Sequence, residues 1–500
     1  MRINVLDYLD ETAARLPDKV SFRDEHTAVT FSQLRSFARA GGSALLKSGI
    51  AKEPVAVYMS KTPSEIASFM AVLEAGCFYV PIDDEMPQMR ISLIFENLKP
   101  RAVICDESTQ ENAKRLAGDA KMFLWDDIKD DEEIPAALDA VRAAMIDTDP
   151  CYIMYTSGST GIPKGVAVCH RSLIDYIESF CEVMRFDEET VFGSQTPFYF
   201  DASLKDIYPT IKLGCETVII PHTLFMFPLK LVDFLNEYKI NTLCWVVSAL
   251  TMISAFGVLD EVVPKYLKIV GFGGEVFPVK QYRKWKKALP DVRYINLYGP
   301  TETTGVSMYY EIDREFEDDE PIPLGRPFEN VDIFLLDGDN KPSDEGEICM
   351  RGTCVTLGYY MDKERTSEAF VQNPLNDRYP EIIYRTGDIA RRNDRGELVF
   401  VSRKDFQIKH MGHRVELGEI EAVADSASEV ARSCAIYIRG KDRIELHYEG
   451  QAEEKAVLSF LKEKLPRYMV PTKVHKVDKL PLTPNGKIDR KALTLKSESK

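Results

Sequence analysis

The residues with the clearest chemical pattern lie in one short segment, YIMYTSGSTGIPKG, which runs from Tyr152 to Gly165. An apolar strand is expected up to Tyr155, and hydroxyl-bearing residues and glycines follow it. Glycines let the backbone bend so that its N–H groups converge on an anion, hydroxyls add donors, and Lys164 adds a full positive charge. The segment therefore predicts a phosphate-binding loop. Its residues are Thr156, Ser157, Gly158, Ser159, Thr160, Gly161 and Lys164.

This loop differs from the GxxxxGK(S/T) loop of P-loop ATPases, because Gly165 rather than Ser or Thr follows the lysine. A flexible Ser/Gly linker is the simplest alternative. Linkers are usually longer, however, and an apolar strand does not usually lead into them. Taken alone, the loop predicts the binding of a phosphate group and nothing more specific.

The elements that must position this loop follow an alternating pattern. Apolar, β-branched runs such as PVAVYMS, RAVICD, ETVIIP and VRYINLYG alternate with amphipathic segments. This alternation predicts an α/β fold with largely parallel sheets. Shorter strands around EICMRG and ELVFVSR predict a β-rich subdomain, and the pattern changes again near residue 405. We therefore expect a large N-terminal domain, residues 1–404, and a small α+β domain, residues 405–500.

Composition restricts the partners of the chain. Its 500 residues exceed what one hydrophobic core usually organises, and its formal net charge of -16 disfavours broad binding to nucleic acid or an anionic membrane. The ten cysteines show no metal-ligand spacing, and the acidic N-terminus lacks the apolar core of a signal peptide. We therefore expect reduced thiols and a cytoplasmic location.

One uncharged stretch, TLCWVVSALTMISAFGVL from Thr242 to Leu259, is about the minimum length for a membrane span. It begins with a β-like run and then changes to helical spacing. That change favours a buried strand that leads into a helix over a membrane span.

The chain as a whole resembles the adenylation domains of nonribosomal peptide synthetases, a superfamily that includes acyl-CoA synthetases and firefly luciferase. Matching segments occur in the expected order along nearly the whole chain. Besides the phosphate loop they are TFSQL, LEAGCFYVPID, FDAS, NLYGPTE, GEICMRG, YRTGD, SRKDFQIKHMGHRVELGEIE, LPRYMVP and NGKIDR. The resemblance implies a ligase that uses ATP and Mg²⁺ to join a carboxylate to AMP.

The resemblance assigns roles around the phosphates, where a carboxylate attacks the α-phosphorus and fixed positive charge is needed. Lys487 in NGKID matches the catalytic lysine, although an exposed lysine in an Asn-Gly turn is the alternative. Glu302 matches the magnesium ligand, and Thr301 and Lys164 are placed at the phosphates.

For the nucleoside, Asp388 matches the acceptor of both ribose hydroxyls, with an ordinary turn aspartate as the alternative. Arg403 matches a second ribose contact, but Ser402 replaces the glycine that usually precedes it. The remaining nucleotide-binding residues implied are Gly273, Gly274, Glu275, Asn296 at the adenine edge, Tyr298 at its face, and Gly299.

Enzymes of this kind rotate the C-terminal domain between two half-reactions. Asp405 matches the hinge, where a few backbone dihedrals absorb the movement. In the second state the loop with Lys409, His410 and Gly412 is implied to replace Lys487 in the site. A solvated charged residue at a domain junction is the alternative for Asp405.

The resemblance also points to the class of acid. Asp201 in FDAS matches the aspartate that pairs with the α-ammonium of an amino acid, although it could instead cap the next helix. Lys205 would need an anion nearby if buried, which favours an acidic or strongly polar substrate side chain unless the lysine extends to solvent. Trp245 and Phe272 could instead shrink the pocket. The full predicted pocket is Asp201, Ala202, Lys205, Trp245, Val270, Phe272, Leu297, Gly305 and Val306.

The expected activity is adenylation of an amino acid, followed by transfer to the phosphopantetheine thiol of a carrier protein. No Ser-bearing carrier segment follows NGKIDRKALTL, so a discrete carrier is expected. The basic run from Lys280 to Lys287 could contact an acidic carrier, but a solvated helix face is the simpler interpretation. The alternatives are an acyl- or aryl-CoA ligase, a D-alanine:carrier protein ligase, and an inactive nucleotide-binding module.

Overall fold

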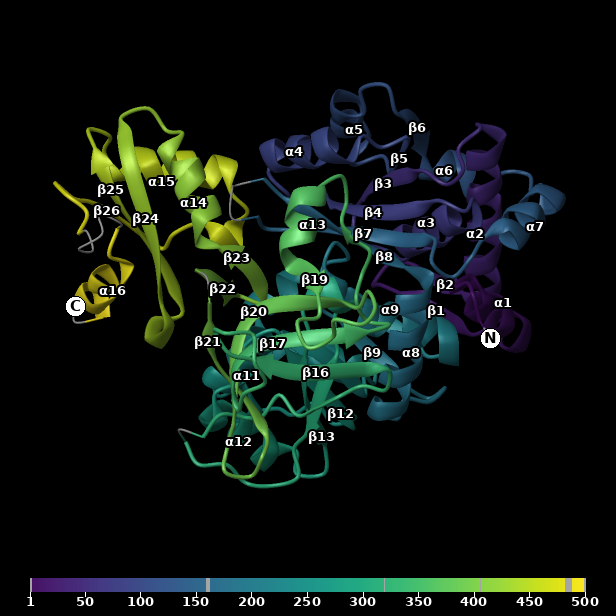
Figure 1. Ribbon diagram of the computed structural model, residues 1–500. Helices are drawn as coiled ribbons and strands as arrows, with labels where there is room; N and C mark the ends of the chain where they lie inside the picture. Colours follow the sequence, from purple (N-terminus) through teal and green to yellow (C-terminus); the bar gives the residue numbers. More distant parts are fainter. Residues whose placement is uncertain (1, 159–161, 319, 405, 482–487, 499–500) are drawn as a thin grey trace. The chain divides into compact units, whose positions relative to one another are not determined.

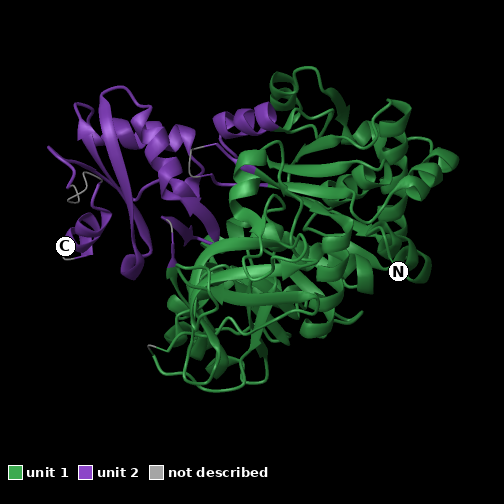
Figure 2. Cartoon of the chain, in the orientation of Figure 1, with its two compact units in different colours: residues 1–84, 98–154, 165–402 green, residues 85–97, 155–164, 403–500 purple. Residues whose placement is uncertain are grey.

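The computed structural model describes residues 2–158, 162–318, 320–404, 406–481 and 488–498. The chain divides into two compact units (Figure 2). Unit 1 consists of residues 1–84, 98–154 and 165–402, and unit 2 of residues 85–97, 155–164 and 403–500. Unit 2 therefore includes two segments from the first third of the chain, in addition to the C-terminal part. The independent movement of residues 405–500 stays a prediction.

The first sheet of unit 1 has seven strands in the order β18-β8-β7-β4-β3-β5-β6. Its central pairs are parallel, and β18 pairs with β8 in the antiparallel sense. Every residue of β3 is buried, as expected for a parallel strand that is covered on both faces. The strands are β3 (Pro54–Met59), β4 (Phe78–Asp83), β5 (Ala102–Cys105), β6 (Lys121–Leu124), β7 (Pro150–Thr156), β8 (Lys164–Cys169) and β18 (Gly358–Tyr359).

Helices of the N-terminal part pack closely around this sheet (Figure 1). The side chain of Thr30 accepts a hydrogen bond from Gln33, in a capping box that starts α2. At Gly41 an added Cβ would lie 2.8 Å from Cβ of Ala71, so a glycine is needed where α2 crosses α3. The helices of this part are α1 (Leu6–Arg15), α2 (Phe31–Lys47), α3 (Pro63–Glu74), α5 (Gln110–Leu116), α6 (Trp125–Ile128) and α7 (Pro135–Ala144).

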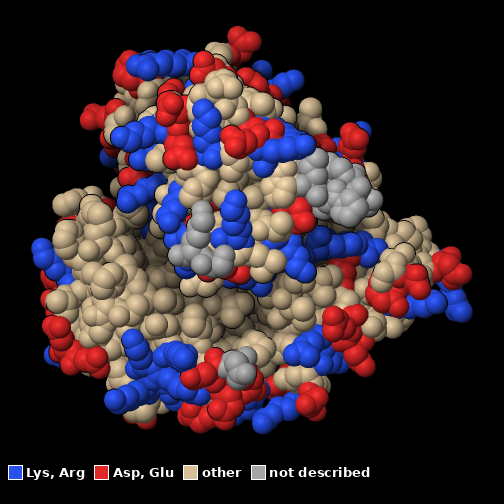
Figure 3. Space-filling model, turned by 90° about the vertical axis from the view of Figure 1, so that its left-hand side faces the viewer, with Lys and Arg blue, Asp and Glu red and all other residues tan. Residues whose placement is uncertain are grey.

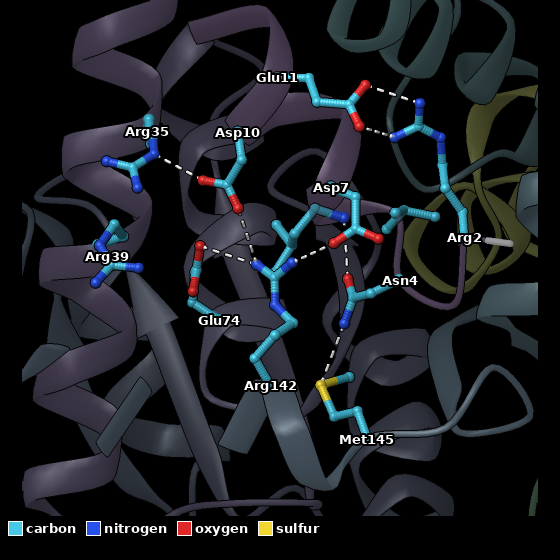
Figure 4. Close-up of polar contacts among 12 residues, drawn as sticks. Arg2, Asn4, Asp7, Asp10, Glu11, Arg35, Arg39, Glu74, Arg142 and Met145 are labelled. Carbon is cyan, nitrogen blue, oxygen red and sulfur yellow. Dashed lines mark hydrogen bonds and ion pairs between the residues drawn. The ribbon is translucent and has the colours of Figure 1, made fainter. Parts of the chain in front are cut away.

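Polar contacts attach α1 to its neighbours (Figure 4). Arg142 of α7 donates to Asp7 at 2.8 Å and lies 3.4 Å from the carboxylate of Glu74 on α3. Arg35 of α2 donates to Asp10 at 2.7 Å. These contacts orient α1, while its apolar face packs into the core.

The second sheet of unit 1 has nine strands in the order β15-β14-β13-β12-β11-β9-β10-β1-β2. Its centre is parallel, and antiparallel strands close both edges. The strands are β1 (Val20–Arg23), β2 (Ala28–Thr30), β9 (Val191–Ser194), β10 (Glu216–Ile219), β11 (Thr242–Val246), β12 (Ile269–Gly273), β13 (Arg293–Tyr298), β14 (Met308–Glu311) and β15 (Arg326–Pro327).

The two faces of this sheet pack into two different hydrophobic cores. Cys244 of β11 belongs to the core that also contains α8 and α9, whereas its neighbours Leu243 and Trp245 belong to the core with α10, α11 and α12. This is the period-two alternation of a strand covered on both sides. The helices are α8 (His170–Met184), α9 (Leu204–Leu213), α10 (Pro228–Glu237), α11 (Val247–Ala255) and α12 (Val279–Ala288).

The uncharged stretch from Thr242 to Leu259 forms β11 and then α11, which confirms the prediction of a buried strand leading into a helix. Among the described helices, none combines the length and the apolar character that crossing a membrane requires. The α/β fold with parallel-rich sheets is likewise confirmed.

A smaller sheet forms the β-rich part of unit 1. Its order is β16-β17-β20-β19, and β21 pairs with β20. The elements of this part are β16 (Val331–Leu336), β17 (Glu345–Gly352), α13 (Lys363–Ala369), β19 (Phe370–Gln372), β20 (Ile382–Arg392) and β21 (Leu398–Arg403).

Unit 2 contains a two-stranded sheet, β22-β23, and a three-stranded sheet, β24-β25-β26. Helices α14 and α15 cover one face of the larger sheet, with Ile420, Leu446 and Leu461 in a shared core. The elements are α4 (Gln88–Leu98), β22 (Gln407–His410), β23 (His413–Glu416), α14 (Leu417–Asp425), β24 (Val430–Ile438), β25 (Arg443–Gly450), α15 (Glu454–Lys464), β26 (Lys473–Lys476) and α16 (Arg490–Glu498).

Charged side chains of both signs lie close together on the face drawn in Figure 3. The basic residues of α12 likewise have acidic neighbours, because Lys280 and Arg283 both form ion pairs with Asp318. Lys284 and Lys286 donate to the backbone carbonyls of Ser254 and Pro290. These contacts favour a solvated helix face over a dedicated carrier-binding patch.

Candidate functional site

Asp201 lies at the start of a 3-10 turn, Asp201–Ser203, directly before α9. The N-cap of α9 is Ser203, so Asp201 does not cap this helix as the alternative supposed. An added Cβ at Gly305 would lie 3.7 Å from Oδ2 of Asp201. The Asp201 carboxylate therefore adjoins the turn around Gly305, and glycine at this position keeps the adjacent space open.

Two tyrosines lie close to this carboxylate. Burial raises the pKa of Tyr152 and Tyr176 well above the ordinary value, and the negative charge of Asp201 raises both further. Both hydroxyl oxygens are buried and make no hydrogen bond within the described residues. Asp201 itself is half-buried, and the buried tyrosines beside it lower the local polarity, which strengthens its attraction for a cation.

Glu302 lies in the short 3-10 turn Thr301–Thr303, a few residues before Gly305. Its side chain is fully buried, and the Tyr359 hydroxyl donates to Oε1 at 2.7 Å. The backbone N–H of Thr356 donates to the Glu302 carbonyl at 3.2 Å. A buried carboxylate that is oriented by a hydroxyl donor, with the Thr301 hydroxyl next to it in sequence, offers the hard oxygen ligands that Mg²⁺ prefers. The residues present fit a magnesium ion held partly by phosphate oxygens.

Asp388 lies on β20 and is 5% exposed. The hydroxyl of Tyr298, the last residue of β13, donates to Oδ2 of Asp388 at 2.6 Å. The backbone N–H of Asp388 donates to the Thr386 hydroxyl at 3.0 Å. This brings together the two residues predicted for the ribose and the adenine face, and it excludes a simple turn aspartate because Asp388 is inside a strand.

Asn296 and Glu275 already have partners within the protein. The Asn296 amide donates to the Pro323 carbonyl at 2.8 Å, and its side-chain oxygen is an acceptor, as the predicted contact with an adenine amine requires. Oε2 of Glu275 accepts the backbone N–H of Ser248 at 2.9 Å, at the start of α11, where a helix favours negative charge. Glu275 therefore anchors the loop that follows β12 to α11.

Glycines shape the same region. An added Cβ at Gly273 would lie 2.3 Å from the Leu297 carbonyl oxygen, and one at Gly299 would lie 2.6 Å from that of Gly305. Gly274 has φ of +87°, a conformation that other residues rarely adopt, although nothing lies within 4 Å of its added Cβ. Close backbone approach explains the first two glycines, and backbone conformation explains the third.

The predicted pocket residues do not all gather around Asp201. Lys205 is buried on α9, and Leu297 and Val306 belong to the core on the Asp201 side of the nine-stranded sheet. Ala202, the second residue of the 3-10 turn, is half-buried. By contrast, a different core contains the three residues taken from β11 and β12, namely Trp245, Val270 and Phe272.

These three residues lie on the opposite face of the sheet because of strand alternation. Trp245 pairs with Phe272 in register, and Cys244 pairs with Gly271. The Trp245 indole N–H donates to the Gly193 carbonyl at 2.7 Å, inside the core with α10 and α11. An added Cβ at Gly271 would instead meet Met184, Leu297 and Cys244, all on the Asp201 side. The structure therefore brings Cys244 and Gly271 towards the Asp201 side of the sheet and not Trp245, Val270 or Phe272.

Lys205 has a buried, ionisable carboxyl group, that of Asp206, beside it within the protein. Burial raises the pKa of Asp206 to about 7, while the positive charges of Lys205 and Lys61 oppose that rise. Lys61 donates to the carbonyls of Ser194 and Gln195 at 3.1 and 3.2 Å, and burial lowers its pKa to about 8. A buried charge network around Asp206 thus partly satisfies Lys205, so the lysine does not by itself require an acidic substrate.

Sequence reasoning missed Asp206, Cys244 and Gly271. Asp206 belongs to no sequence motif, and only its neighbour Lys205 was predicted to line the pocket. A glycine in the middle of an otherwise apolar strand was the available signal for Gly271, since such glycines mark close approach of another group.

Residues 9–360 match the family described as AMP-binding enzyme, which covers more than half of the chain. The chain belongs to the AMP-binding enzyme family. Among curated relatives, tyrocidine synthase 1 of Brevibacillus parabrevis is 31% identical over 496 residues, which is 97% of this chain and 44% of that protein. The chain thus spans less than half of the length of that relative. The L-proline–(L-prolyl-carrier protein) ligase of Pseudomonas fluorescens is 29% identical, over 97% of each chain.

Solved structures show the same fold as this AMP-binding enzyme. Holo-PA1221, an NRPS protein with adenylation and PCP domains bound to a vinylsulfonamide inhibitor, aligns with a TM-score of 0.82 at 24% identity. The alignment covers 98% of this chain and 84% of that one. IdnL1 aligns with a TM-score of 0.79 at 25% identity, over 96% and 99% of the two chains. Membership of this family implies the use of ATP.

In unit 2 of this AMP-binding enzyme, the described part of the phosphate loop already has protein partners. The Ser157 hydroxyl donates to the Arg414 carbonyl at 2.8 Å. The Glu419 carboxylate forms a short ion pair with Arg90 and accepts the backbone N–H of Gly158. Two predicted phosphate donors therefore contact the segment from β23 to α14. Thr156 and Lys164, at the ends of β7 and β8, flank the loop.

Several other predicted residues also belong to unit 2. Arg403 ends β21, and Ser402 lies within that strand, in extended backbone that does not need a glycine. His410 ends β22 with Nδ1 3.0 Å from Oδ1 of Asp442, and Lys409 precedes it. Gly412 has φ of +79° in the turn to β23. The following predicted residues lie outside the described part of the chain: Ser159, Thr160, Gly161, Asp405 and Lys487.

Proposed function

We propose that this AMP-binding enzyme activates the carboxylate of an α-amino acid as an aminoacyl-AMP and releases pyrophosphate. The acyl group then passes to the phosphopantetheine thiol of a separate carrier protein. The observation that supports the amino acid is the position of Asp201, a half-buried carboxylate beside two buried tyrosines and next to the open turn at Gly305. The α-ammonium group of an amino acid would form a charged hydrogen bond with this carboxylate, whereas an acid without an ammonium group offers it no positive charge.

The proposed binding of the nucleotide uses groups on β13 and β20. Asp388 accepts the ribose hydroxyls, and Tyr298, held by its hydrogen bond to Asp388, presents its ring to the adenine. The Asn296 side-chain oxygen accepts a hydrogen bond from the adenine amine. Glu302 and Thr301 would hold Mg²⁺, which would supply positive charge that neutralises part of the phosphate charge. Tyr359 keeps the Glu302 carboxylate oriented.

The proposed chemistry is an in-line displacement. The substrate carboxylate oxygen attacks the α-phosphorus, the new C–O–P link forms, and the bond to the pyrophosphate oxygen breaks. Lys487 and Lys164 supply fixed positive charge as negative charge grows on the phosphoryl oxygens. In the second half-reaction the carrier thiolate attacks the acyl carbon, and AMP leaves.

The carrier partner is proposed from the comparisons. The Pseudomonas relative is named for its prolyl-carrier protein, and it aligns with this chain over 97% of each length. The PA1221 structure joins an adenylation domain to a PCP domain. The substrate side chain contacts the region of Lys205, Leu297 and Val306, where Asp206 removes the need for an acidic group.

Amino-acid-dependent exchange of labelled pyrophosphate into ATP tests the proposal. A panel of amino acids and their deamino analogues is assayed with wild-type enzyme, Asp201→Ala and the isosteric Asp201→Asn. We expect exchange with at least one amino acid, and a loss of about tenfold to a hundredfold for both variants with amino acids only, as for a lost charged hydrogen bond. Equal losses for amino acids and deamino analogues would contradict the ammonium role.

Lys487→Ala serves as the chemical control. It should retain ATP binding but lose at least about a hundredfold in exchange, as when one preorganised charge-stabilising donor is removed. Loading of labelled amino acid onto holo-carrier, compared with free coenzyme A, then tests the acceptor. Faster discharge by free coenzyme A would favour the CoA-ligase alternative.

A further inference from the structure

A second cluster of ligand-type side chains lies in unit 2, apart from every residue assigned above. Glu445 and His447 are two residues apart on β25, and therefore point to the same face of the sheet. His475 on the parallel strand β26 is the register partner of His447. Strand alternation and register thus place three side chains with metal-binding atoms next to one another.

The distances among these atoms are close to those in a metal site. Nε2 of His475 lies 3.4 Å from Oε2 of Glu445, and Nε2 of His447 lies 4.0 Å from the same oxygen. All three ligand atoms lie within 4.8 Å of one another. Zinc bonds of about 2.0–2.2 Å in a tetrahedral site separate ligand atoms by roughly 3.3–3.5 Å, so one pair already fits and small side-chain rotations bring in the third atom.

The surroundings orient the cluster as an outer shell does in metal sites. Arg443 forms a short ion pair with Oε1 of Glu445, which leaves Oε2 towards the two imidazoles. The two imidazole rings stack with centroids 4.8 Å apart and an interplanar angle of 28°. The Ser497 hydroxyl of α16 lies 3.5 Å from Nε2 of His447, close to the spacing of a fourth ligand. Contacts that hold ligand side chains in place favour metal binding, because less ordering of these side chains is needed when the ion arrives.

Burial makes the cluster selective and still accessible. Glu445 is 1% exposed and His447 is 6% exposed, whereas the side chain of His475 is 34% exposed. An ion can therefore enter from the His475 side and then bind next to a buried carboxylate. Two imidazoles and one carboxylate match the ligand preference of zinc and neighbouring transition metals, and not that of Mg²⁺, which prefers oxygen ligands.

We propose that Glu445, His447 and His475 bind one divalent transition-metal ion, with Zn²⁺ as the best match in ligand type, and with water or Ser497 in the fourth position. The ion would join β25 to the edge strand β26 and lie against α16. It is distinct from the magnesium ion assigned to Glu302.

Calorimetric titration of untagged, metal-free protein with ZnCl₂, without nucleotide, tests this site. We expect one equivalent to bind, a rise in the melting temperature, and no such rise with Mg²⁺. His447→Gln and His475→Gln should each weaken Zn²⁺ binding at least about tenfold, because each removes a direct ligand and even the loss of an outer partner costs this much. The exposed His26, changed to Gln, is the matched control and should bind as wild type does.

A second readout keeps the test valid if one variant folds poorly. Co²⁺ should give visible d–d absorption typical of four-coordinate nitrogen and oxygen ligands in the wild type and in His26→Gln, and this band should disappear in Glu445→Gln. Wild-type protein that binds no Zn²⁺, or equal Zn²⁺ binding by all variants, overturns the proposal. If no Zn²⁺ binds and the melting temperature depends strongly on pH, the cluster is instead an ion-pair network between protonated histidines and Glu445.

Discussion

The two faces of the nine-stranded sheet in unit 1 differ in what their side chains do. On the face towards α9, the strands present Gly271, Cys244 and Leu297, near the buried charges of Lys205 and Asp206. On the other face, the same strands present large apolar groups that fill the core with α10, α11 and α12. The α9 face therefore combines small residues with buried ionisable groups, whereas large apolar and aromatic groups fill the opposite face.

The largest expected effect comes from the stabilising face. Phe272→Ala removes a fully buried ring that packs edge-to-face on Phe277, with centroids 4.9 Å apart. We expect a loss of about 3–5 kcal/mol in the free energy of unfolding, measured by urea denaturation. The ranking of amino acid substrates, measured at low temperature on folded protein, should not change.

Leu297→Ala, on the other face, is the comparison for Phe272→Ala and should change that ranking. A changed ranking in Phe272→Ala with little loss of stability would show instead that Phe272 lines the pocket, as the sequence predicted.

The next effect concerns the charges on the α9 side. Asp206 has an ordinary pKa of 3.8 and about 7 when folded, because burial disfavours its ionised form. Between these pH values the unfolded chain releases a proton that the folded chain keeps, so stability falls as pH rises. The slope approaches about 1.4 kcal/mol per pH unit at most.

Asp206→Asn should remove this part of the pH dependence, which urea denaturation at pH 4, 5.5 and 7 would measure. Asp18→Asn, at an exposed aspartate, is the control. Parallel pH profiles for wild type and Asp206→Asn would show that Asp206 is ionised throughout, and would place a fixed negative charge beside Lys205.

The smallest effect compares two glycines on the two faces. An added Cβ at Gly271 would lie 2.9 Å from Cε of Met184 and 3.0 Å from Cδ1 of Leu297, both on the α9 side. At Gly193 it would lie 3.1 Å from side chains of Ile220 and Ile240, in the other core. The two positions thus offer equally tight space on opposite faces.

Gly271→Ala should lower kcat/KM by about tenfold for the largest accepted amino acid and less for small ones, because one methyl group in a pocket has an effect of this size. Gly193→Ala should reduce stability without changing the ranking. Steady-state kinetics over the substrate panel would measure both. Identical rankings for the two variants would contradict the assignment of the Gly271 side to the substrate.

The sequence predicted the fold well because the signals are local. The change from β-like spacing, up to Val247, to helical spacing gave β11 and α11 with a boundary within one residue of the observed one. The face of the sheet on which a strand residue lies was harder to predict. An alignment shift of one residue exchanges Trp245 with Cys244 and Phe272 with Gly271. The positions of Asp206 beside Lys205, and of His475 beside His447, depend on packing and register, which no local pattern encodes.

The contact between Gly158 and Glu419 has a consequence for nucleotide affinity. A carboxylate of the protein already accepts the N–H of Gly158, which the sequence predicts to bind a phosphate oxygen, and the Ser157 hydroxyl donates to the Arg414 carbonyl. An incoming nucleotide must compete with this internal anion, so its apparent dissociation constant equals the intrinsic one divided by the fraction of molecules in which the loop is released. Replacing Glu419 by a shorter or neutral residue would therefore tighten ATP binding without adding any contact to ATP.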